Sequence, residues 1–427
     1  MQQATETALS SDTPQSTPAI SGAVGCERAG KTVTGLVTFF FDFRNPAHEQ
    51  DKGTVYTLSV NVPGEAAPVL EKPLRFTELI LTPWVALNSH RLPNGPTAIT
   101  FSLKHPNGNT LWQGSISINI ANTGWLAEQV KESVRRFHTP VVVDGGCATT
   151  HYDYDDSSVR PWFDRDNAFD HIEQRLRKRE ISADDAAKLE QFVLDGFIVL
   201  PDLLSKTQLD RINAELDDAI AKKVEGYEYG SSQRIHQLHL QYAGIRELWR
   251  NPTVLRLLDL IFEAPARPCQ SLTYVFGSQQ YAHQDTVFLT PFPAGYMCGV
   301  WYSLEDIRPD SGELEVFRGS HRLPRVYMHD VGLPKIAECG WPRFEATVPP
   351  LWKKMIDAGK FERIVYRPKA GTALIWHENL MHGGSTRIDQ SLSRRSIVTH
   401  NFADGAIAYY DSTGHVGHME PLENLKA

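Results

Sequence analysis

The segment QYAHQDTVFL, residues 280–289, places a histidine and an aspartate two positions apart in a stretch that otherwise resembles a β-strand. Residues i and i+2 of a strand point to the same face, so His283 and Asp285 can offer one imidazole nitrogen and one carboxylate oxygen to a metal ion. The motif alone is weak, since about one His-x-Asp is expected by chance in a chain of this composition. A second pair, His151 and Asp153, lies in an acidic, loop-like stretch with no strand to aim it, and we set it aside.

The remaining ligand of a two-histidine, one-carboxylate iron site is expected far along the chain, at a strand end. The segment GTALIWHENLMHGGSTRIDQSLSRRSIVTHNF, residues 371–402, offers His377 and His382. Arg394 follows on a β-like run and shares one face with Ser396, Val398 and His400. A buried arginine is costly unless an anion pairs with it, and its planar fork suits a dicarboxylate. Together these residues indicate an iron site with a 2-oxo acid cosubstrate.

The residues around this constellation predict an α+β domain over residues 182–427, with helices first and strands after. Ser182 with Asp185, and Ser205 with Gln208, form capping-box patterns that start two helices. FIVL, residues 197–200, reads as a short buried strand, and Asn251-Pro252 opens a third helix that runs through Phe262. From about residue 271 to 405 short strands and turns dominate.

Residues 23–122 predict an all-β sandwich domain. Apolar residues alternate along 56–62, 99–103 and 116–120, and Asn107-Gly108 marks a hairpin turn. Three tryptophans are either sugar-stacking residues or core residues, and we favour the core: Trp84, Trp112 and Trp125. Residues 1–22 read as a disordered polar tail. Residues 123–181 are expected to hold one helix, 124–137, and an acidic linker that lacks the spacing of a calcium loop.

The composition excludes several functional classes. A net charge of −8 over 427 residues disfavours nucleic acid and anionic membranes as main partners. The chain has no run of 18 apolar residues, so we predict no membrane span, and its N-terminus does not resemble a signal peptide. The five cysteines form no C-x-x-C pair and no disulfide framework, which suits reduced thiols and a cytoplasmic location.

At these residues the second domain resembles the phytanoyl-CoA dioxygenase family of Fe(II)/2-oxoglutarate oxygenases. The resemblance runs from FVLDGFIVLPDLLSKTQLDRI near residue 192, through His-Gln-Asp and LEDIRPDSGELEVFRGSHR at 304–322, to RRSIVTHNF near 402. The order and spacing of these elements are similar to those of the family. The resemblance implies that a double-stranded β-helix, which is a cupin-like jelly-roll barrel with flanking helices, follows the N-terminal β-sandwich along the chain.

The resemblance also implies roles for individual residues. His283 and Asp285 match the proximal iron ligands, and His382 matches the distal ligand because the family's histidine is followed by glycine; His377 is the second choice. Arg394 matches the arginine that grips the distal carboxylate of 2-oxoglutarate, with Arg395 as a minor alternative. Gln284 and Trp301 fall where the family has further cosubstrate contacts.

Other residues of the resembling segment have less specific roles. Ser320 and His321 are expected to be structural. Glu313 and Tyr302 are candidates for the substrate pocket or, equally, ordinary turn and core residues.

The function implied is an Fe(II)/2-oxoglutarate-dependent dioxygenase with O2 as cosubstrate, hydroxylating an unactivated C–H bond of a small molecule. A glycan or glycolipid precursor is our substrate hypothesis, by analogy with oxygenases that carry an extra β-sandwich. One alternative is a non-catalytic ligand- or carbohydrate-binding protein built on a degenerate oxygenase barrel. Another is a cupin-like barrel with a different metal, such as zinc, which has no need of Arg394.

Overall fold

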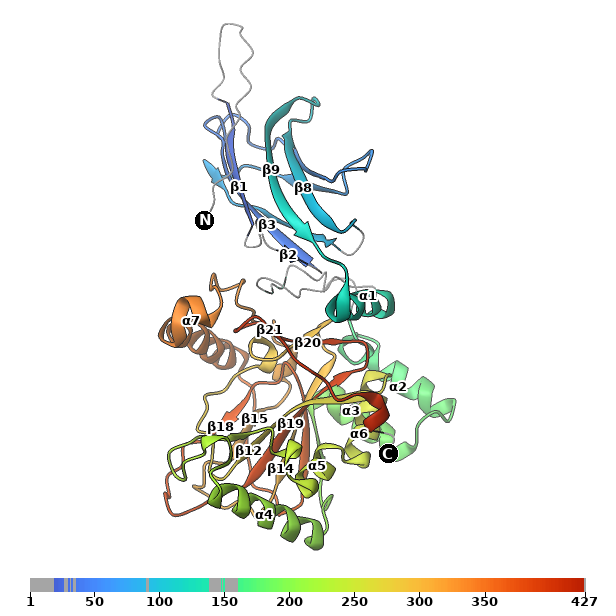
Figure 1. Ribbon diagram of the computed structural model, residues 1–427, viewed down its shortest axis with the longest axis vertical. Coiled ribbons are helices and arrows are strands. Elements are labelled where there is room, and N and C mark those ends of the chain that lie inside the picture. Colours follow the sequence, from blue (N-terminus) through green and yellow to red (C-terminus); the bar gives the residue numbers. More distant parts are fainter. Residues whose placement is uncertain are drawn as a thin grey trace, which may run out of the picture. The chain divides into compact units, whose positions relative to one another are not determined.

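The computed structural model describes residues 19–26, 30, 32–33, 36–89, 92–137, 147, 149 and 160–425. The chain divides into two compact units, Met1–Gly145 and Gly146–Ala427, each drawn in Figure 1. A polar tail is predicted for residues 1–22. Residues 1–18 of it lie outside the described residues, whereas its last two residues, Ser21 and Gly22, belong to the first strand.

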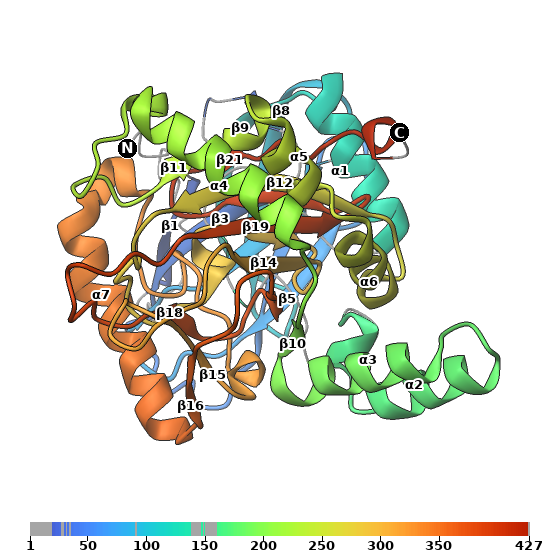
Figure 2. The same cartoon turned by 90° about the horizontal axis from the view of Figure 1, so that it is seen from below.

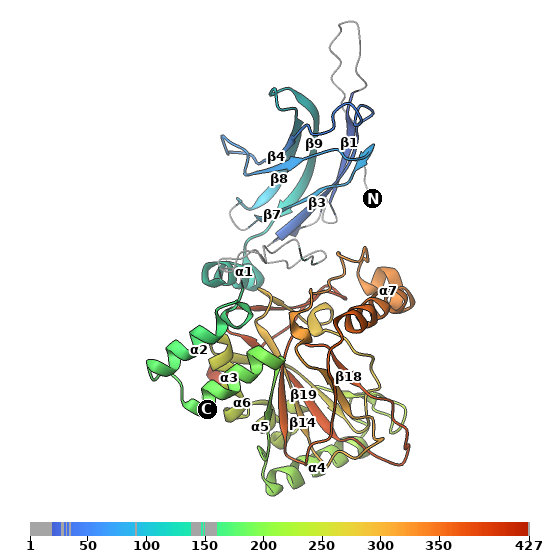
Figure 3. The ribbon, with the colours of Figure 1, turned by 180° about the vertical axis from the view of Figure 1, so that it is seen from behind.

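The N-terminal unit is a sandwich of two sheets, and most of their strands are labelled in Figures 1 and 3. One sheet comprises β1 (Ser21–Cys26), β3 (Leu36–Arg44), β6 (Ile80–Leu81) and β7 (Trp84–Asn88). The other has the order β2 (Thr32–Val33), β9 (Thr110–Ile120), β8 (Gly95–Lys104), β4 (Tyr56–Asn61), β5 (Leu70–Leu74). Helix α1 (Gly124–Phe137) follows, with the bounds that the sequence predicts.

The sandwich core is built from the inward positions of the alternating strands. Phe41 of β3 meets Phe101 of β8 edge-to-face, and Phe43 meets Trp112 of β9 in the same way. Trp112 is buried and its Nε1 donates to the carbonyl of Gly22 at 2.8 Å, so it is a core residue and not a sugar platform. The side chains of Trp84 and Trp125 lie outside the described residues.

The second unit contains a double-stranded β-helix formed by facing antiparallel sheets. The larger sheet has the order β10 (Phe197–Leu200), β17 (Ala373–His377), β14 (Met297–Ser303), β19 (Ser396–Ala403), β12 (Ala266–Tyr274), β11 (Ile235–His236). The smaller sheet has the order β16 (Arg363–Tyr366), β15 (Leu314–Phe317), β18 (His382–Gly384). A third sheet joins β13 (Thr290–Phe292), β20 (Ile407–Tyr410) and β21 (His415–Val416).

The interior between the two main sheets is apolar. Its core includes Trp301 of β14 and Trp376 of β17 from the larger sheet, with Leu314 and Val316 of β15 from the smaller one. This burial fixes the two sheets face to face, so side chains at their edges converge on one cavity.

Helices flank the barrel of this unit. They are α2 (Ala168–Arg177), α3 (Ala183–Asp195), α4 (Lys206–Ala221), α5 (Ala243–Trp249), α6 (Pro252–Phe262) and α7 (Ile336–Gly359). Figure 2 shows α7 on the opposite side of the unit from α2, α3 and α6. Both predicted capping boxes are present, at Ser182 and at Ser205, and α6 starts at Pro252 as predicted.

The stretch interpreted as a linker is ordered where the structure describes it. Trp162 and Phe163 form part of a short 3₁₀ turn, η4 (Trp162–Asp164), and both are buried within the second unit. Trp162 donates its Nε1 hydrogen to the carbonyl of Ile261 at 2.7 Å. No helix among the described residues is long and apolar enough to cross a membrane.

Candidate active site

His283 and Asp285 reach the same point by a route that differs from the one the sequence predicts. His283 is not in a continuous strand: it forms an isolated antiparallel bridge with His382, with N–O distances of 2.9 and 3.1 Å. Asp285 opens a 3₁₀ turn, η7 (Asp285–Val287), and its backbone N–H donates to the carbonyl of Glu378. The strand prediction for this motif is therefore wrong, although the two side chains do converge.

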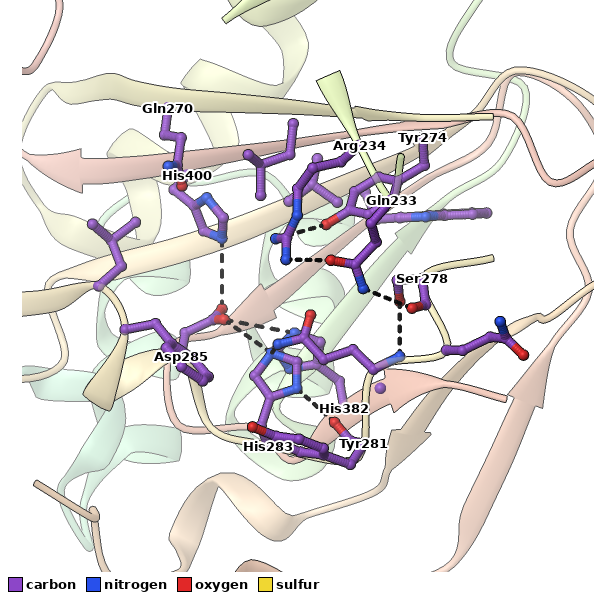
Figure 4. Close-up of a pocket in the computed structure, with 18 of the residues that line it drawn as sticks. Gln233, Arg234, Gln270, Tyr274, Ser278, Tyr281, His283, Asp285, His382 and His400 are labelled. Atoms are coloured by element: carbon purple, nitrogen blue, oxygen red, sulfur yellow. Dashed lines mark hydrogen bonds and ion pairs between the residues drawn. The ribbon is translucent and has the colours of Figure 1, made fainter. Parts of the chain in front are cut away.

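His283, Asp285 and His382 form a compact, buried cluster of potential metal ligands. One ligand atom from each residue lies within 4.8 Å of the other two. Oδ1 of Asp285 lies 3.6 Å from Nε2 of His283 and 3.7 Å from Nε2 of His382. Figure 4 shows the three side chains pointing toward one another in the cavity.

Hydrogen bonds from neighbouring groups orient each of these side chains. Nδ1 of His283 lies 2.9 Å from the carbonyl of Tyr281, and Nδ1 of His382 lies 2.9 Å from the carbonyl of Leu380. A carbonyl only accepts, so each Nδ1 carries the proton and each Nε2 keeps a lone pair for a metal. Trp376 donates its Nε1 hydrogen to Oδ2 of Asp285 at 2.8 Å, which leaves Oδ1 free to bind.

The charge states also suit a divalent cation. Burial raises the pKa of Asp285, but the neighbouring His382, His283 and His400 outweigh it and hold this pKa well below its usual range. Burial lowers the pKa of His382 to about 4. At neutral pH the cluster therefore holds an ionised carboxylate beside a neutral imidazole, which is the form that binds metal.

His377, the second choice for a ligand, lies elsewhere. It is fully buried; its Nε2 is 3.2 Å from Oδ1 of Asp164, and its Nδ1 accepts from the backbone N–H of Asn379. His321 packs against the ring of His377, and its Nε2 lies 3.2 Å from the carbonyl of Val193. Neither histidine lines the cavity that contains the cluster.

Arg394 lines the cavity, just before β19 and not on the strand itself. It is 2% exposed and lies against the rings of Tyr274 and Trp301, at 5.7 and 5.8 Å from their centroids. Its Nε is buried with no hydrogen-bond partner in the described part of the chain. Burial lowers its pKa to about 10, so it stays charged at neutral pH. Arg395 instead binds Asp217, away from the cavity.

Trp301 and Gln284, the two further residues expected to contact the cosubstrate, differ in where the structure places them. Trp301 is buried and lines the cavity, and its Nε1 has no hydrogen-bond partner among the described residues. Gln284 does not line it. Its Nε2 donates to the carbonyl of Pro324 at 2.9 Å and its Oε1 accepts from Trp352 at 3.0 Å. The structure therefore corrects the expectation for Gln284, because both ends of its amide bind protein groups outside the cavity.

The candidate pocket residues Glu313 and Tyr302 are structural. Glu313 is buried and binds Arg367 and Ser385, and Tyr302 is buried in β14. Neither lines the cavity.

Several cavity residues were not singled out from the sequence. The cavity has a volume of about 570 Å³, a size typical of small-molecule sites. Nε2 of His400, on β19, lies 3.8 Å from Oδ2 of Asp285. The sequence did hold one indication that His400 lines the cavity, because strand alternation places it on the same face as Arg394. It held no such indication for Trp376 or Arg234, which lie far in sequence from the side chains that they face.

The donor set fits an iron(II) site with a dicarboxylate cosubstrate. Two imidazole nitrogens and one carboxylate oxygen form the facial set that leaves open positions on non-haem iron. The buried, unpaired Nε of Arg394 in the same cavity suits the far carboxylate of such a ligand.

Comparisons with known proteins agree with this chemistry. Residues 192–396 match the family model "Phytanoyl-CoA dioxygenase (PhyH)". Peroxisomal phytanoyl-CoA dioxygenase of Bos taurus is 23% identical over 244 residues, which cover 52% of this chain and 68% of that protein.

Solved structures with a similar arrangement are more distant. The α-ketoglutarate-dependent epimerase SnoN of nogalamycin biosynthesis is 16% identical, with a TM-score of 0.40, over 53% of this chain and 85% of its own. EctD from S. alaskensis with bound Fe is 20% identical, with a TM-score of 0.40, over 52% of this chain and 77% of its own.

Proposed function

Residues 192–396 form a domain of the phytanoyl-CoA dioxygenase family, and from this premise we propose that the chain hydroxylates an unactivated C–H bond of a small molecule. The protein is an Fe(II)- and 2-oxoglutarate-dependent dioxygenase, with O2 as cosubstrate. The observation that carries the proposal is the buried cluster of His283, Asp285 and His382 in one cavity with Arg394, whose buried Nε has no hydrogen-bond partner among the described residues.

Each residue has a defined task in this proposal. His283, His382 and Oδ1 of Asp285 hold the iron, and Arg394 holds the distal carboxylate of 2-oxoglutarate. Trp301 and Tyr274 pack against the guanidinium of Arg394 and exclude water from it, which strengthens the attraction between this charge and an anion. When bound, iron, 2-oxoglutarate and O2 supply the oxidation: one oxygen atom enters the C–H bond and the other enters succinate, with release of CO2.

For the substrate we propose a glycan or glycolipid precursor. Trp341 of α7 lines the same cavity and remains 52% exposed, although its ring meets that of Phe344 edge-to-face at 5.7 Å. Glu345, one helical turn further on, also lines the cavity and accepts a hydrogen bond from Tyr281. An open aromatic face beside a carboxylate suits a sugar ring and its hydroxyls.

We also place the protein in the cytoplasm. Three cysteines, Cys147, Cys269 and Cys298, are buried as free thiols. Burial raises the pKa of these three thiols, so they are inert in a reducing compartment.

The test is an anaerobic titration of the protein with Fe(II) and 2-oxoglutarate, followed by the visible charge-transfer band of the chelate. We expect the band in wild type and its loss in Asp285→Ala, while Asp389→Ala, an exposed aspartate in the same unit, retains it. Absence of the band in folded wild-type protein that contains iron would contradict the proposal. Succinate formation under air then separates the enzyme from a zinc cupin or a binding protein.

A further inference from the structure

The cavity contains a second arginine, Arg234, that the proposed chemistry does not use. It is half-buried and directly precedes β11. Nη1 donates to the hydroxyl of Tyr274 at 3.3 Å, and Nη2 donates to Oε1 of Gln233 at 2.6 Å. Gln233 is fixed in turn by a hydrogen bond from its Nε2 to the carbonyl of Ser278 at 2.8 Å. Figure 4 shows Arg234 and Gln233 across the cavity from Asp285.

Within the described part of the chain, no carboxylate pairs with Arg234. Two other partly buried arginines of this unit have such partners, Arg325 with Asp164 and Glu378, and Arg395 with Asp217, whereas Arg246 donates to the backbone carbonyls of His239 and Leu240. A guanidinium that is partly removed from water loses hydration, and an anion normally compensates for that loss. Arg234 and Arg394 share this lack of a carboxylate, and both line the same cavity.

Both arginines lie near the same aromatic ring. The guanidinium carbons of Arg234 and Arg394 lie 5.8 and 5.7 Å from the centroid of Tyr274. Arg394 is the more deeply buried of the two, and the far carboxylate of 2-oxoglutarate satisfies its fork. Arg234 uses two of its five N–H donors, so three remain for a different molecule.

The charges of the cavity support this division. Iron(II), Asp285 and Arg394 together carry two positive charges, which the 2-oxoglutarate dianion neutralises. The charge of Arg234 then remains. Glu345 is the other acidic side chain that lines the cavity among the described residues, but it is exposed and solvated. A cavity of about 570 Å³ has room for a second small molecule beside 2-oxoglutarate.

We propose that Arg234, positioned by Gln233, binds an oxyanion of the substrate, either a carboxylate or a phosphate group. The inference rests on the proposed function and narrows its substrate class to acidic molecules, such as a uronic acid or a sugar phosphate. The fork of Arg234 would bind the acidic group in two places and so fix which C–H bond faces the iron site.

The test measures binding and not turnover. Protein loaded anaerobically with Fe(II) and 2-oxoglutarate is titrated calorimetrically with D-glucose, D-glucuronate and D-glucose 1-phosphate. We expect at least one acidic sugar to bind about tenfold tighter than glucose. Arg234→Gln should abolish that preference, Arg234→Lys should restore part of it, and Arg308→Gln, which removes an exposed charge outside the cavity, should leave it intact. Preference for glucuronate or for the phosphate identifies the group.

Three results would overturn the inference. One is equal binding of all three sugars to wild type. Another is an unchanged preference in Arg234→Gln. A third is loss of 2-oxoglutarate affinity in Arg234→Gln, which would assign Arg234 to the cosubstrate. The charge-transfer band of wild type separates these results from failure of the proposed function, since that failure removes the band before any sugar is added.

Discussion

At the scale of single residues, the candidate iron site depends on groups that do not touch the metal. Trp376 donates to Oδ2 of Asp285 and thereby holds Oδ1 toward His283 and His382. Such supporting hydrogen bonds commonly change metal affinity by about 10- to 100-fold. The same logic applies to the carbonyls of Tyr281 and Leu380, but these belong to the backbone and side-chain substitution leaves them in place.

We therefore expect Trp376→Phe to weaken Fe(II) binding by about tenfold, since the ring volume is largely retained while the N–H is lost. Competition with a metal-sensing dye under nitrogen measures this. Trp352→Phe is the matched control, because its Nε1 hydrogen goes to Gln284 and not to a candidate ligand. Equal affinities for wild type and Trp376→Phe would show that Asp285 is held by packing alone.

The pH dependence of the metal-free protein follows from His382. Burial lowers its pKa to about 4, whereas a free imidazole titrates near 6.5. The unfolded chain therefore takes up a proton at a higher pH than the folded protein. Protonation of this side chain in the unfolded state therefore lowers the free energy of unfolding. The loss begins as the pH falls below about 6.5 and grows until the pH approaches 4.

We expect the free energy of unfolding of the metal-free protein to fall over this pH range, and to fall less steeply in His382→Gln. Urea denaturation across the range measures both slopes. His239 and His321, whose pKa values burial lowers to about 4 and about 3, contribute to the acid sensitivity that remains in the variant. Identical slopes for the two proteins would contradict the assignment to His382.

At the scale of elements, the sequence predicted local features better than distant ones. The capping boxes at Ser182 and Ser205 are local, since a side chain and a backbone N–H three residues apart satisfy each other. The turn at Asp285 is not local. It depends on the carbonyl of Glu378 and the indole of Trp376, about ninety residues later. A His-x-Asp pattern cannot show whether a strand or a turn presents it, so the residues were predicted and their secondary structure was not.

The stretch near residue 160 illustrates the same limit. Its acidic composition is typical of a solvated linker. In the fold, however, Asp164 contacts His377 and Arg325, which lie more than 150 residues further along the chain. These partners hold the carboxylate ionised: burial raises the pKa of Asp164, but His377 and Arg325 together keep this pKa well below its usual range. The η4 turn is thus anchored to the barrel by charge as well as by Trp162.

We expect Asp164→Asn to lower the free energy of unfolding by about 3 kcal/mol, because it leaves Arg325 with one acidic partner in a buried setting. Urea denaturation monitored by tryptophan fluorescence measures the loss. Asp166→Asn, an exposed neighbour, is the control and should change little. A small effect of Asp164→Asn would mean that η4 is held by its apolar side chains alone.

At the scale of the whole molecule, the sandwich core and the apolar clusters of the second unit have no described residue in common. The sandwich core draws on strands β1 to β9, and the candidate iron site lies wholly in the second unit. Each core buries enough apolar side chains to support a cooperative transition of its own. Damage to one core should therefore leave the chemistry of the other unit in place.

Phe101→Ala tests this separation. The side chain is 1% exposed and packs on Phe39 and Phe41, so its truncation should destabilise the sandwich by about 3–5 kcal/mol. We expect calorimetry to show one transition moved to lower temperature and a second one unmoved, while the charge-transfer band of Fe(II) with 2-oxoglutarate keeps its wild-type amplitude. Asn107→Ala, at the exposed hairpin turn, is a control within the same sheet. If both transitions move together, or if the band weakens with Phe101→Ala, then the sandwich contributes to the stability of the oxygenase unit and the two cores are energetically coupled.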